Sequence, residues 1–228
     1  MPLLRVLAFG EFHFSTMKSP RSPRKKPVQD RSQITVDALV DAATRIFRDK
    51  GFAGATTNRV AEIAGVSVGS LYQYFPNKTA LLTAVREKVH REFMEQMITA
   101  CARGCERPFE PAVRGMAETS AAFHEQNSRL YRLFAAELPA TPPVDFKSLP
   151  GLRYQEVQAR FFQVHAECIK IPRDQALFFT RHAGAAIMQA AVMNHTEKLR
   201  DGSIATQLTR AFVAYLSGGT AGIEPIDS

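Results

Sequence analysis

The pattern that most constrains the fold lies at residues 56–75, where two short helical segments flank a single glycine. Thr56-Thr57 can cap the first helix and Ser67 can cap the second. Gly65 stands between the two segments, where a left-handed backbone is least costly for glycine. The apolar residues that would face inward are Val60, Ala61, Ala64, Val66, Leu71 and Phe75. This spacing predicts a helix-turn-helix, a unit that presents its second helix to the major groove of DNA.

Helical periodicity continues on both sides of this unit. Apolar residues recur at helical spacing from Ile34 to Phe47, and Lys50-Gly51 is typical of a helix end. Asn77 can cap a long helix that ends near Gly104. Proline and glycine then separate five further helical spans, expected at residues 111–126, 128–138, 150–170, 174–198 and 203–217. Since no run alternates as a strand would, we expect an all-α fold of about nine helices.

Basic residues are concentrated near the start of the chain. The net charge is +7, and residues 1–31 contain seven basic and two acidic residues, or 7 − 2 = +5. Prolines, serines and threonines crowd residues 15–31, so we expect residues 1–31 to form a disordered basic arm. Such an arm suits a polyanion such as DNA. The alternatives are a solvated tail and a translation start at Met17.

The hydrophobic runs and the cysteines of the sequence indicate the cellular compartment in which we expect the protein. No stretch is long enough for a membrane span, and the apolar leader before Gly10 lacks a cleavage site, so we expect no signal peptide. The three cysteines, Cys101, Cys105 and Cys168, indicate a reducing compartment rather than a disulfide framework. Cys101 and Cys105 are four residues apart on the long helix, where inert thiols are expected and a thiol switch is the alternative.

The second short helix has a free face suited to reading DNA. The residues on this face are Val68, Gly69, Ser70, Gln73 and Tyr74. Glutamine can pair with adenine through two hydrogen bonds, serine can bond several base edges, and a glycine allows close approach to a phosphate. Tyr72, Tyr74 and Lys78 offer donors for phosphates, together with the N–H groups at the start of the following helix.

The stretch T-T-N-R-V-A-E-I-A-G-V-S-V-G-S-L-Y-Q-Y-F-P-N-K-T-A-L, Thr56 to Leu81, resembles the N-terminal signature of the TetR family of bacterial regulators. The preceding F-R-D-K-G-F, Phe47 to Phe52, also matches, and the resemblance covers residues 33–93. It implies that Thr57 and Asn58 lie near the DNA backbone and that Val68–Tyr74 is the recognition helix. It further implies that Tyr72, Tyr74 and Lys78 hold phosphates.

The resemblance also implies how the chain is divided. We expect a helix-turn-helix domain at residues 32–80, a ligand-binding and dimerisation domain at residues 81–217, and a flexible tail at residues 218–228. The expected protein is a cytoplasmic bacterial regulator associated with the nucleoid. Its expected partners are a palindromic DNA operator, a second copy of itself and a small hydrophobic effector that relieves repression, with no cofactor or metal.

The later helices supply candidates for the dimer contact and for the pocket. Small residues between Ala183 and Ala191 allow close helix approach, so spans 174–198 and 203–217 are the expected dimer helices. Soft and aromatic side chains predict an apolar pocket, with His124, His165 and Gln189 as scattered polar groups. The candidate pocket residues are Met94, Met97, Cys101, Met116, Phe123, Phe134, Phe161, Phe162, His165 and Met188. For any one of them, a place in a close-packed core is the alternative.

Other functions compete with this interpretation. Residues 65–69 spell G-x-S-x-G, the nucleophile motif of serine hydrolases, but that motif requires a preceding strand, whereas a short helix is expected here. The histidines have no spacing typical of metal ligands. A constitutive architectural DNA-binding protein would share the helix-turn-helix but would need no cavity.

Overall fold

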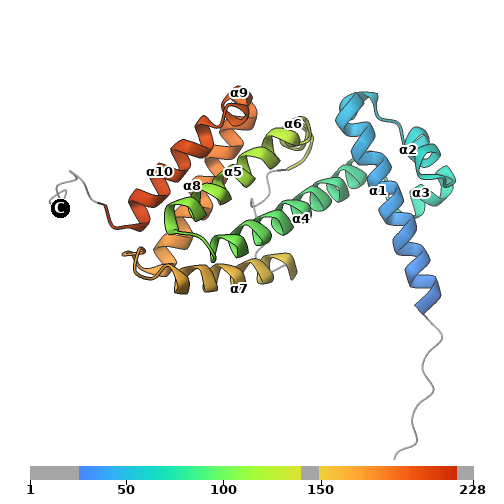
Figure 1. Ribbon diagram of the computed structural model, residues 1–228. Coiled ribbons are helices and arrows are strands. Elements are labelled where there is room, and N and C mark those ends of the chain that lie inside the picture. Colours follow the sequence, from blue (N-terminus) through green and yellow to red (C-terminus); the bar gives the residue numbers. More distant parts are fainter. Residues whose placement is uncertain (1–25, 140–148, 220–228) are drawn as a thin grey trace, which may run out of the picture.

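The computed structural model describes residues 26–139 and 149–219, and these residues form ten helices and no strand (Figure 1). In chain order the helices are α1 (Lys26–Gly54), α2 (Thr57–Ala64), α3 (Val68–Tyr74), α4 (Lys78–Gly104), α5 (Phe109–Gln126), α6 (Ser128–Glu137), α7 (Leu149–Val164), α8 (Arg173–Asn194), α9 (Thr196–Arg200) and α10 (Ser203–Leu216). The all-α prediction is confirmed. The count is one higher than expected because the backbone breaks at His195 and divides the span 174–198 into α8 and α9.

The first helix begins earlier than the sequence suggested. Residues 26–31, which were expected in the disordered arm, belong to α1. Pro27 does not prevent this, because proline is tolerated in the first turn of a helix, where its missing N–H has no partner in any case. Gly51 interrupts α1 with a φ of 68°, close to the expected helix end. The rest of the expected arm, residues 1–25, and the end of the expected tail, residues 220–228, lie outside the described residues.

Helices α1, α2 and α3 form a small unit at one end of the molecule (Figure 1). Its core contains Leu39, Phe47, Val60 and Leu71, which are almost fully buried. The same apolar cluster continues through Val85 and Val89 on α4 and into α5 and α6. The helix-turn-helix unit is therefore joined to the rest of the protein by a continuous core.

Helix α4 leads from this unit into a larger helical domain (Figure 1). In that domain α4 packs against α5 and α7, and α5 packs against α10. A second apolar cluster joins α5, α8, α9 and α10, and a third joins α4, α5 and α7. Among the described residues, no helix is long and apolar enough to cross a membrane.

Candidate DNA-binding surface and ligand cavity

Three side-chain caps define the helices of the helix-turn-helix unit. Thr56 accepts from the N–H of Arg59 at the start of α2, and Ser67 accepts from the N–H of Ser70 at the start of α3. Asn77 accepts from the N–H of Ala80 at the start of α4. Such a cap satisfies a donor that the first helical turn leaves without a partner. The positions of all three caps agree with the sequence prediction.

The turn between α2 and α3 depends on one glycine. Gly65 has a φ of 69°, and its N–H bonds back to the carbonyls of Ala61 and Glu62. The turn sets α3 against α2, and Leu71, which is fully buried, anchors α3 to the core. One side of α3 is thereby held by the core, and its opposite side remains in solvent.

The predicted DNA-contacting residues lie on α3 and at the starts of α2 and α4. Asn58, Gly69, Tyr72, Gln73 and Tyr74 are exposed, whereas Thr57, Val68, Ser70 and Lys78 are half-buried. The Tyr72 hydroxyl lies 3.1 Å from Thr57 Oγ1, so the two side chains join α3 to α2. Ser70 Oγ lies 2.8 Å from Ser67 Oγ. Gln73 is the one amide side chain of α3, and it is exposed.

Lys78 has a structural role that its position in the motif did not reveal. Its Nζ donates to the carbonyl of Phe52 at 2.7 Å and to that of Ala55 at 3.2 Å. The same ammonium lies 4.1 Å from the centre of the Phe52 ring. In this structure Lys78 therefore holds the end of α1 against the start of α4. Arg59 forms an ion pair with Glu62 on the surface of α2.

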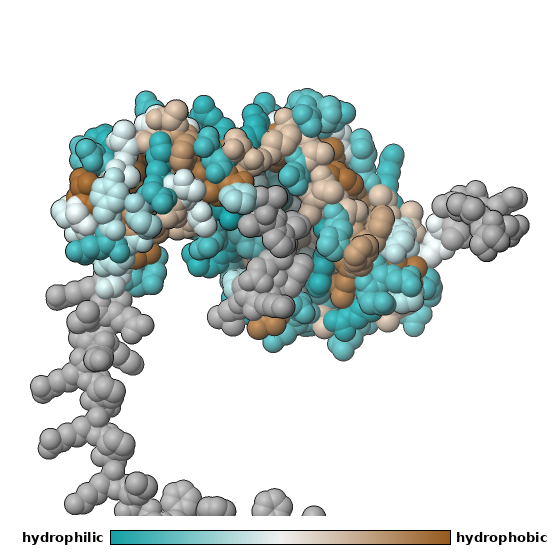
Figure 2. Space-filling model, turned by 180° about the vertical axis from the view of Figure 1, so that it is seen from behind, coloured by the Kyte–Doolittle hydropathy of each residue, from teal (hydrophilic) through white to brown (hydrophobic). Residues whose placement is uncertain are grey.

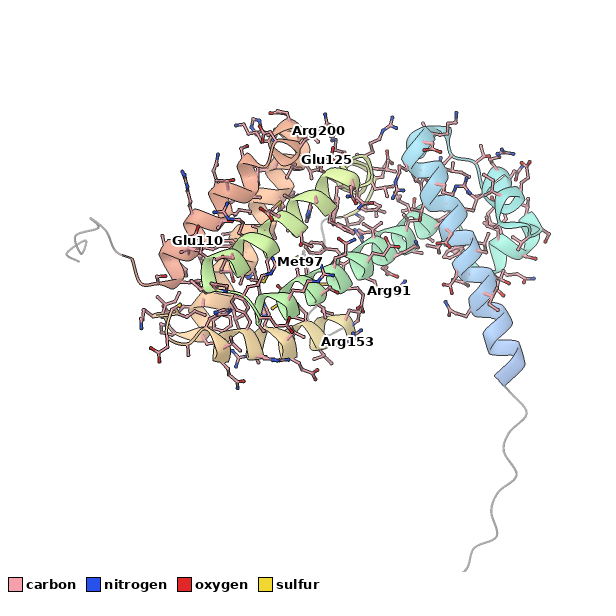
Figure 3. All side chains as sticks on the ribbon, viewed as in Figure 1. Arg91, Met97, Glu110, Glu125, Arg153 and Arg200 are labelled. Atoms are coloured by element: carbon pink, nitrogen blue, oxygen red, sulfur yellow. The ribbon has the colours of Figure 1, made fainter. Side chains whose placement is uncertain are left out.

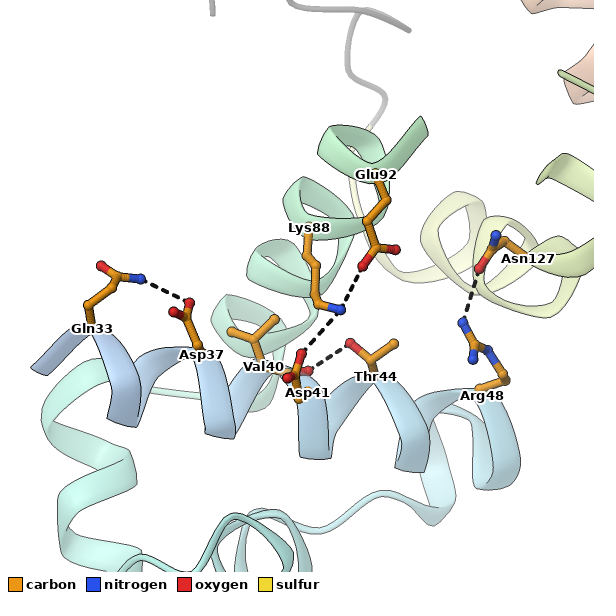
Figure 4. A network of polar contacts seen from close by, with 9 residues as sticks. All are labelled: Gln33, Asp37, Val40, Asp41, Thr44, Arg48, Lys88, Glu92 and Asn127. Carbon is orange, nitrogen blue, oxygen red and sulfur yellow. Dashed lines mark hydrogen bonds and ion pairs between the residues drawn. The ribbon is translucent and has the colours of Figure 1, made fainter. Parts of the chain in front are cut away.

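Polar contacts tie α1 to the larger domain (Figure 4). Lys88 on α4 bridges Asp41 on α1, at 3.1 Å, and Glu92 on its own helix, at 2.7 Å. The two carboxylates raise the pKa of Lys88 despite its partial burial. Arg48 on α1 donates to Oδ1 of Asn127 in the turn between α5 and α6. Two separate polar links thus connect the helix-turn-helix unit to the helices behind it.

A cavity of about 850 Å³ lies inside the larger domain. Its walls come from α4, α5, α6, α7, α8 and α10, and apolar side chains make up most of them. Figure 3 marks Arg91 and Met97, which lie on α4 and belong to the wall. Cavities of 300–1,000 Å³ with mainly apolar walls are the usual form of small-molecule sites.

Eight of the ten candidate pocket residues line this cavity. They are Met94, Met97, Cys101, Met116, Phe134, Phe161, Phe162 and Met188. Phe123 and His165 do not line it. Phe123 packs against Phe93 in the core shared with the helix-turn-helix unit, and His165 packs against Phe109 and Phe161, with Nε2 beside the carbonyl of Gly104.

The wall also contains polar residues that the sequence analysis missed. Tyr154 and Gln158 on α7 and Tyr131 on α6 all line the cavity. Tyr154 and Gln158 are four residues apart and hence on one face of α7, which is the signal that could have identified them. His124 and Gln189, which were expected as polar groups of the pocket, do line the wall, as does Arg181.

Burial keeps several of these polar groups neutral. Desolvation lowers the pKa of His124. The hydrogen bond between its Nδ1 and the carbonyl of Ser120, at 2.8 Å, offsets only part of this effect. The His124 ring stacks on Tyr131, and burial raises the pKa of that phenol. The three cysteines are free thiols, and burial raises the pKa of Cys101 to about 12. A cysteine with so high a pKa is a poor nucleophile, which favours the inert-thiol interpretation.

The hydrolase motif at residues 65–69 lies in a different local structure from that of a hydrolase. Helix α2 precedes it where a strand would be needed. Ser67 Oγ accepts from the N–H of Ser70 at 3.0 Å and serves as the cap of α3. The serine is thus explained by helix capping.

Comparison with known proteins bears on both parts of the molecule. Residues 39–85 match the family model of bacterial regulatory proteins of the tetR family. The nucleoid occlusion factor SlmA of Glaesserella parasuis is 30% identical over 111 residues, which are 48% of this chain and 51% of that protein. The HTH-type transcriptional regulator CymR of Pseudomonas putida is 30% identical over 102 residues, 45% of this chain and 49% of that protein. The chain thus spans about half the length of the curated relatives it matches.

A solved structure shows the same fold over most of the chain. The crystal structure of a TetR-family transcriptional regulator from Pectobacterium atrosepticum superposes with a TM-score of 0.60. The superposition covers 86% of this chain and 99% of that protein, at 18% sequence identity. At this identity the likeness concerns the fold alone.

Proposed function

We propose that the chain is a ligand-responsive repressor, because residues 39–85 match the family model of bacterial regulatory proteins of the tetR family and the fold resembles that of a solved TetR-family regulator. In this proposal a homodimer binds a palindromic operator, and a small hydrophobic ligand releases it. The observation that carries the proposal is the cavity of about 850 Å³, because α4 supplies part of its wall and begins directly after the recognition helix.

The way α4 connects the two sites supports this mechanism. Lys78, in its first turn, contacts the end of α1, and Met94, Met97 and Cys101 face the cavity farther along the same helix. A ligand that shifts α4 would therefore move the DNA-binding unit, because a packed helix moves largely as a rigid body. Such coupling typically amounts to about 1–3 kcal/mol. A constitutive architectural protein would have no need of the cavity.

A dimer is proposed because one short helix reads only a few base pairs, and a second copy doubles the site. Helices α8 and α10 are the proposed contact. On α8, Ala186 and Ala190 are exposed, and so are the large apolar side chains Phe178 and Ile187. Figure 2, which views the molecule from behind, shows apolar residues among hydrophilic ones on the surface of the larger helical domain.

The proposed DNA contacts follow from the exposed side of α3. Gln73 is assigned to a base edge, and Asn58, Tyr72 and Tyr74 to the phosphate backbone, with Gly69 allowing close approach. Ser70 and Thr57 can also reach DNA if their present side-chain partners are exchanged for DNA acceptors.

The experiment begins with the selection of bound duplexes from random DNA by the full chain. We expect a palindrome, and Gln73→Ala should reduce affinity for it by about 1–3 kcal/mol and relax preference at one position per half-site. Compounds with hydrophobic bodies are then tested for release of the selected duplex. In the cavity variant Met97→Trp, release should change while binding of the duplex without ligand stays within a few-fold.

Two results would contradict the proposal. Selection of DNA without any sequence preference, combined with no response to any compound, would favour the architectural alternative. Equal loss of affinity on every duplex for Gln73→Ala would remove this residue from base recognition.

A further inference from the structure

The charged residues of the cavity wall are mostly cationic. Among the described residues that line it are three arginines, Arg86, Arg91 and Arg181, and one carboxylate, Glu87, a balance of 3 − 1 = +2. Arg86, Glu87 and Arg91 lie on α4, and Arg86 donates to the carbonyl of Pro139, which also lines the cavity. Arg181 lies on α8. The cavity thus has one arginine that does not come from α4.

Arg181 lies within a compact set of hydrogen-bonding groups. Its NH2 group donates to Oε1 of Gln158, and the Gln158 side chain also bonds with Tyr154, so three wall residues from α7 and α8 form one polar cluster. A guanidinium carries five N–H donors in a planar fork that matches a carboxylate. The cluster can therefore receive a further acceptor without losing its link to Gln158.

The electrostatic surroundings of this cluster favour an anion. Desolvation lowers the pKa of Arg181, Tyr154 offsets part of this effect, and the positive charge of Arg173 lowers the pKa further. Arg173 itself lies over the Phe162 ring, another wall residue, at 5.9 Å. A bound anion would offset both the repulsion between the two guanidinium groups and the cost of removing Arg181 from water. Tyr154 remains a neutral donor, because burial raises the pKa of its phenol.

The rest of the wall suits the apolar part of a ligand. Met94, Met188 and Phe161 are buried, and Met97 and Met116 are half-buried beside them. Thioether side chains adapt their shape to an apolar body more readily than branched ones. The cavity therefore combines one polar cluster with a larger adaptable apolar wall.

We propose that the ligand of this cavity is an organic acid, whose carboxylate binds Arg181 with Gln158 and Tyr154 and whose acyl or aryl body fills the methionine-rich wall. The inference rests on the proposed function in treating the cavity as the effector site. A carboxylate fits better than a phosphate ester, because one guanidinium with an amide and a phenol compensates a single negative charge. Arg181 is the residue that determines this specificity.

The test compares acids with their uncharged methyl esters. The probes are decanoic acid with methyl decanoate and 2-naphthoic acid with methyl 2-naphthoate, each titrated calorimetrically into the full chain at pH 7.5. We expect at least one acid to bind about 10- to 100-fold more tightly than its ester, the range that a charged hydrogen bond supplies. Arg181→Gln should bring this ratio close to one and leave ester binding within a few-fold.

Two further variants keep the result interpretable. Arg181→Lys retains the charge and should preserve part of the preference for the acid. Arg160→Gln removes a charge from an exposed position on α7 outside the cavity wall and should leave the ratio unchanged. Each variant is first checked for an unchanged thermal unfolding midpoint. If Arg181→Gln unfolds, the comparison rests on Arg181→Lys and on Gln158→Leu, which removes the amide of the cluster and should also lower the ratio.

The outcomes separate this inference from the proposed function. Esters that bind as tightly as the acids, an acid preference that survives Arg181→Gln, or no saturable binding by either acid would overturn the assignment. Release of the selected duplex by uncharged compounds alone would contradict the proposal of an acidic ligand but would still support a ligand-responsive repressor. Conversely, Arg181-dependent binding of an acid with no effect on DNA would support the ligand class and contradict the proposed function.

Discussion

The Arg48 guanidinium donates a hydrogen bond over 3.0 Å to Oδ1 of Asn127, which joins α1 to the turn between α5 and α6 (Figure 4). Asn127 is buried, and its Nδ2 donates to the carbonyl of Phe123 on α5. His124, three residues earlier, lines the cavity. The helix-turn-helix unit thus contacts the cavity wall through α5 as well as through α4.

Replacing Arg48 with methionine should weaken communication between the two sites. The variant keeps the aliphatic stem but loses the hydrogen bond, so the free energy of unfolding should fall by about 1 kcal/mol. Affinity for the selected duplex without ligand should stay within a few-fold, and the ligand-induced loss of affinity should shrink. Fluorescence anisotropy with and without ligand measures both quantities. Arg45→Met, at an exposed position on the same helix, is the control. An equal ligand-induced loss of DNA affinity in both variants would exclude a role for the contact between Arg48 and Asn127.

Two glycines of the helix-turn-helix unit should respond to alanine in opposite ways. At Gly69 an added Cβ would meet only Ser67 Oγ, at 3.8 Å, so Gly69→Ala should raise the free energy of unfolding by about 0.5–1 kcal/mol. The same methyl group should reduce DNA affinity if the recognition helix approaches the duplex closely there. At Gly65, where φ is 69°, alanine should cost about 1–2 kcal/mol. Denaturant unfolding and duplex titration test both variants, and unchanged DNA affinity in Gly69→Ala would argue against close approach.

Lys78 should contribute to both stability and DNA binding. Lys78→Met removes two hydrogen bonds from an ammonium to backbone carbonyls, so we expect a loss of about 1.5–3 kcal/mol in the free energy of unfolding. If the ammonium also contacts phosphate, affinity should fall evenly across DNA sequences, with a lower salt dependence. Thr79→Met, at the exposed neighbouring position, serves as the control. A stable Lys78→Met protein would show that the carbonyl contacts contribute little.

A charge on the exposed side of α8 should disrupt the proposed dimer. In Ala186→Glu a carboxylate would be buried in the proposed dimer contact, which α8 and α10 form. Sedimentation should then show a monomer. Ala122→Glu makes the same change at an exposed position on α5, outside the proposed contact, and should leave the dimer intact. A dimeric and fully stable Ala186→Glu protein would place the contact elsewhere.

Acid should destabilise the protein through His124. Its pKa in the folded protein is lowered by burial, so the unfolded chain binds the proton more readily. Stability from this residue is therefore complete above the unfolded value of about 6.5 and declines as the pH falls below it, by up to roughly 1.4 kcal/mol per pH unit. Denaturant unfolding between pH 8 and pH 5 should show a weaker pH dependence in His124→Gln than in wild type. His182→Gln, at an exposed position on α8, should behave as wild type does.

Local rules predicted the helix-turn-helix almost completely. The caps at Thr56, Ser67 and Asn77 and the turn at Gly65 each involve residues within five positions of one another, so the sequence alone is enough to recognise them. The family match at residues 39–85 covers this same part of the chain. The start of α1 was missed because the basic and proline-rich composition before Ser32 resembles that of a disordered segment.

The cavity shows which contacts can be predicted from side-chain type and spacing along a helix, and which cannot. An apolar residue in an amphipathic helix is expected to face inward, and eight of the ten candidates do line the cavity. Phe123 and His165 are also buried, but they have other neighbours. Phe123 belongs to the core shared with the helix-turn-helix unit, and His165, just after α7, lies beside the carbonyl of Gly104. Spacing along one helix indicates which residues are buried, and only the packing of the other helices determines what they contact.

The sequence by itself determined the helices, their caps and the exposed side of the recognition helix, because hydrogen bonds and side-chain spacing within a few residues decide these features. Tertiary structure alone decided that Lys78 contacts the carbonyls of Phe52 and Ala55, that Arg48 meets Asn127 across 79 positions, and that Arg181 joins Gln158 and Tyr154 in one cavity. The physical reason is that these contacts depend on the rotation and separation of helices distant in sequence, which only the packing of the whole core sets.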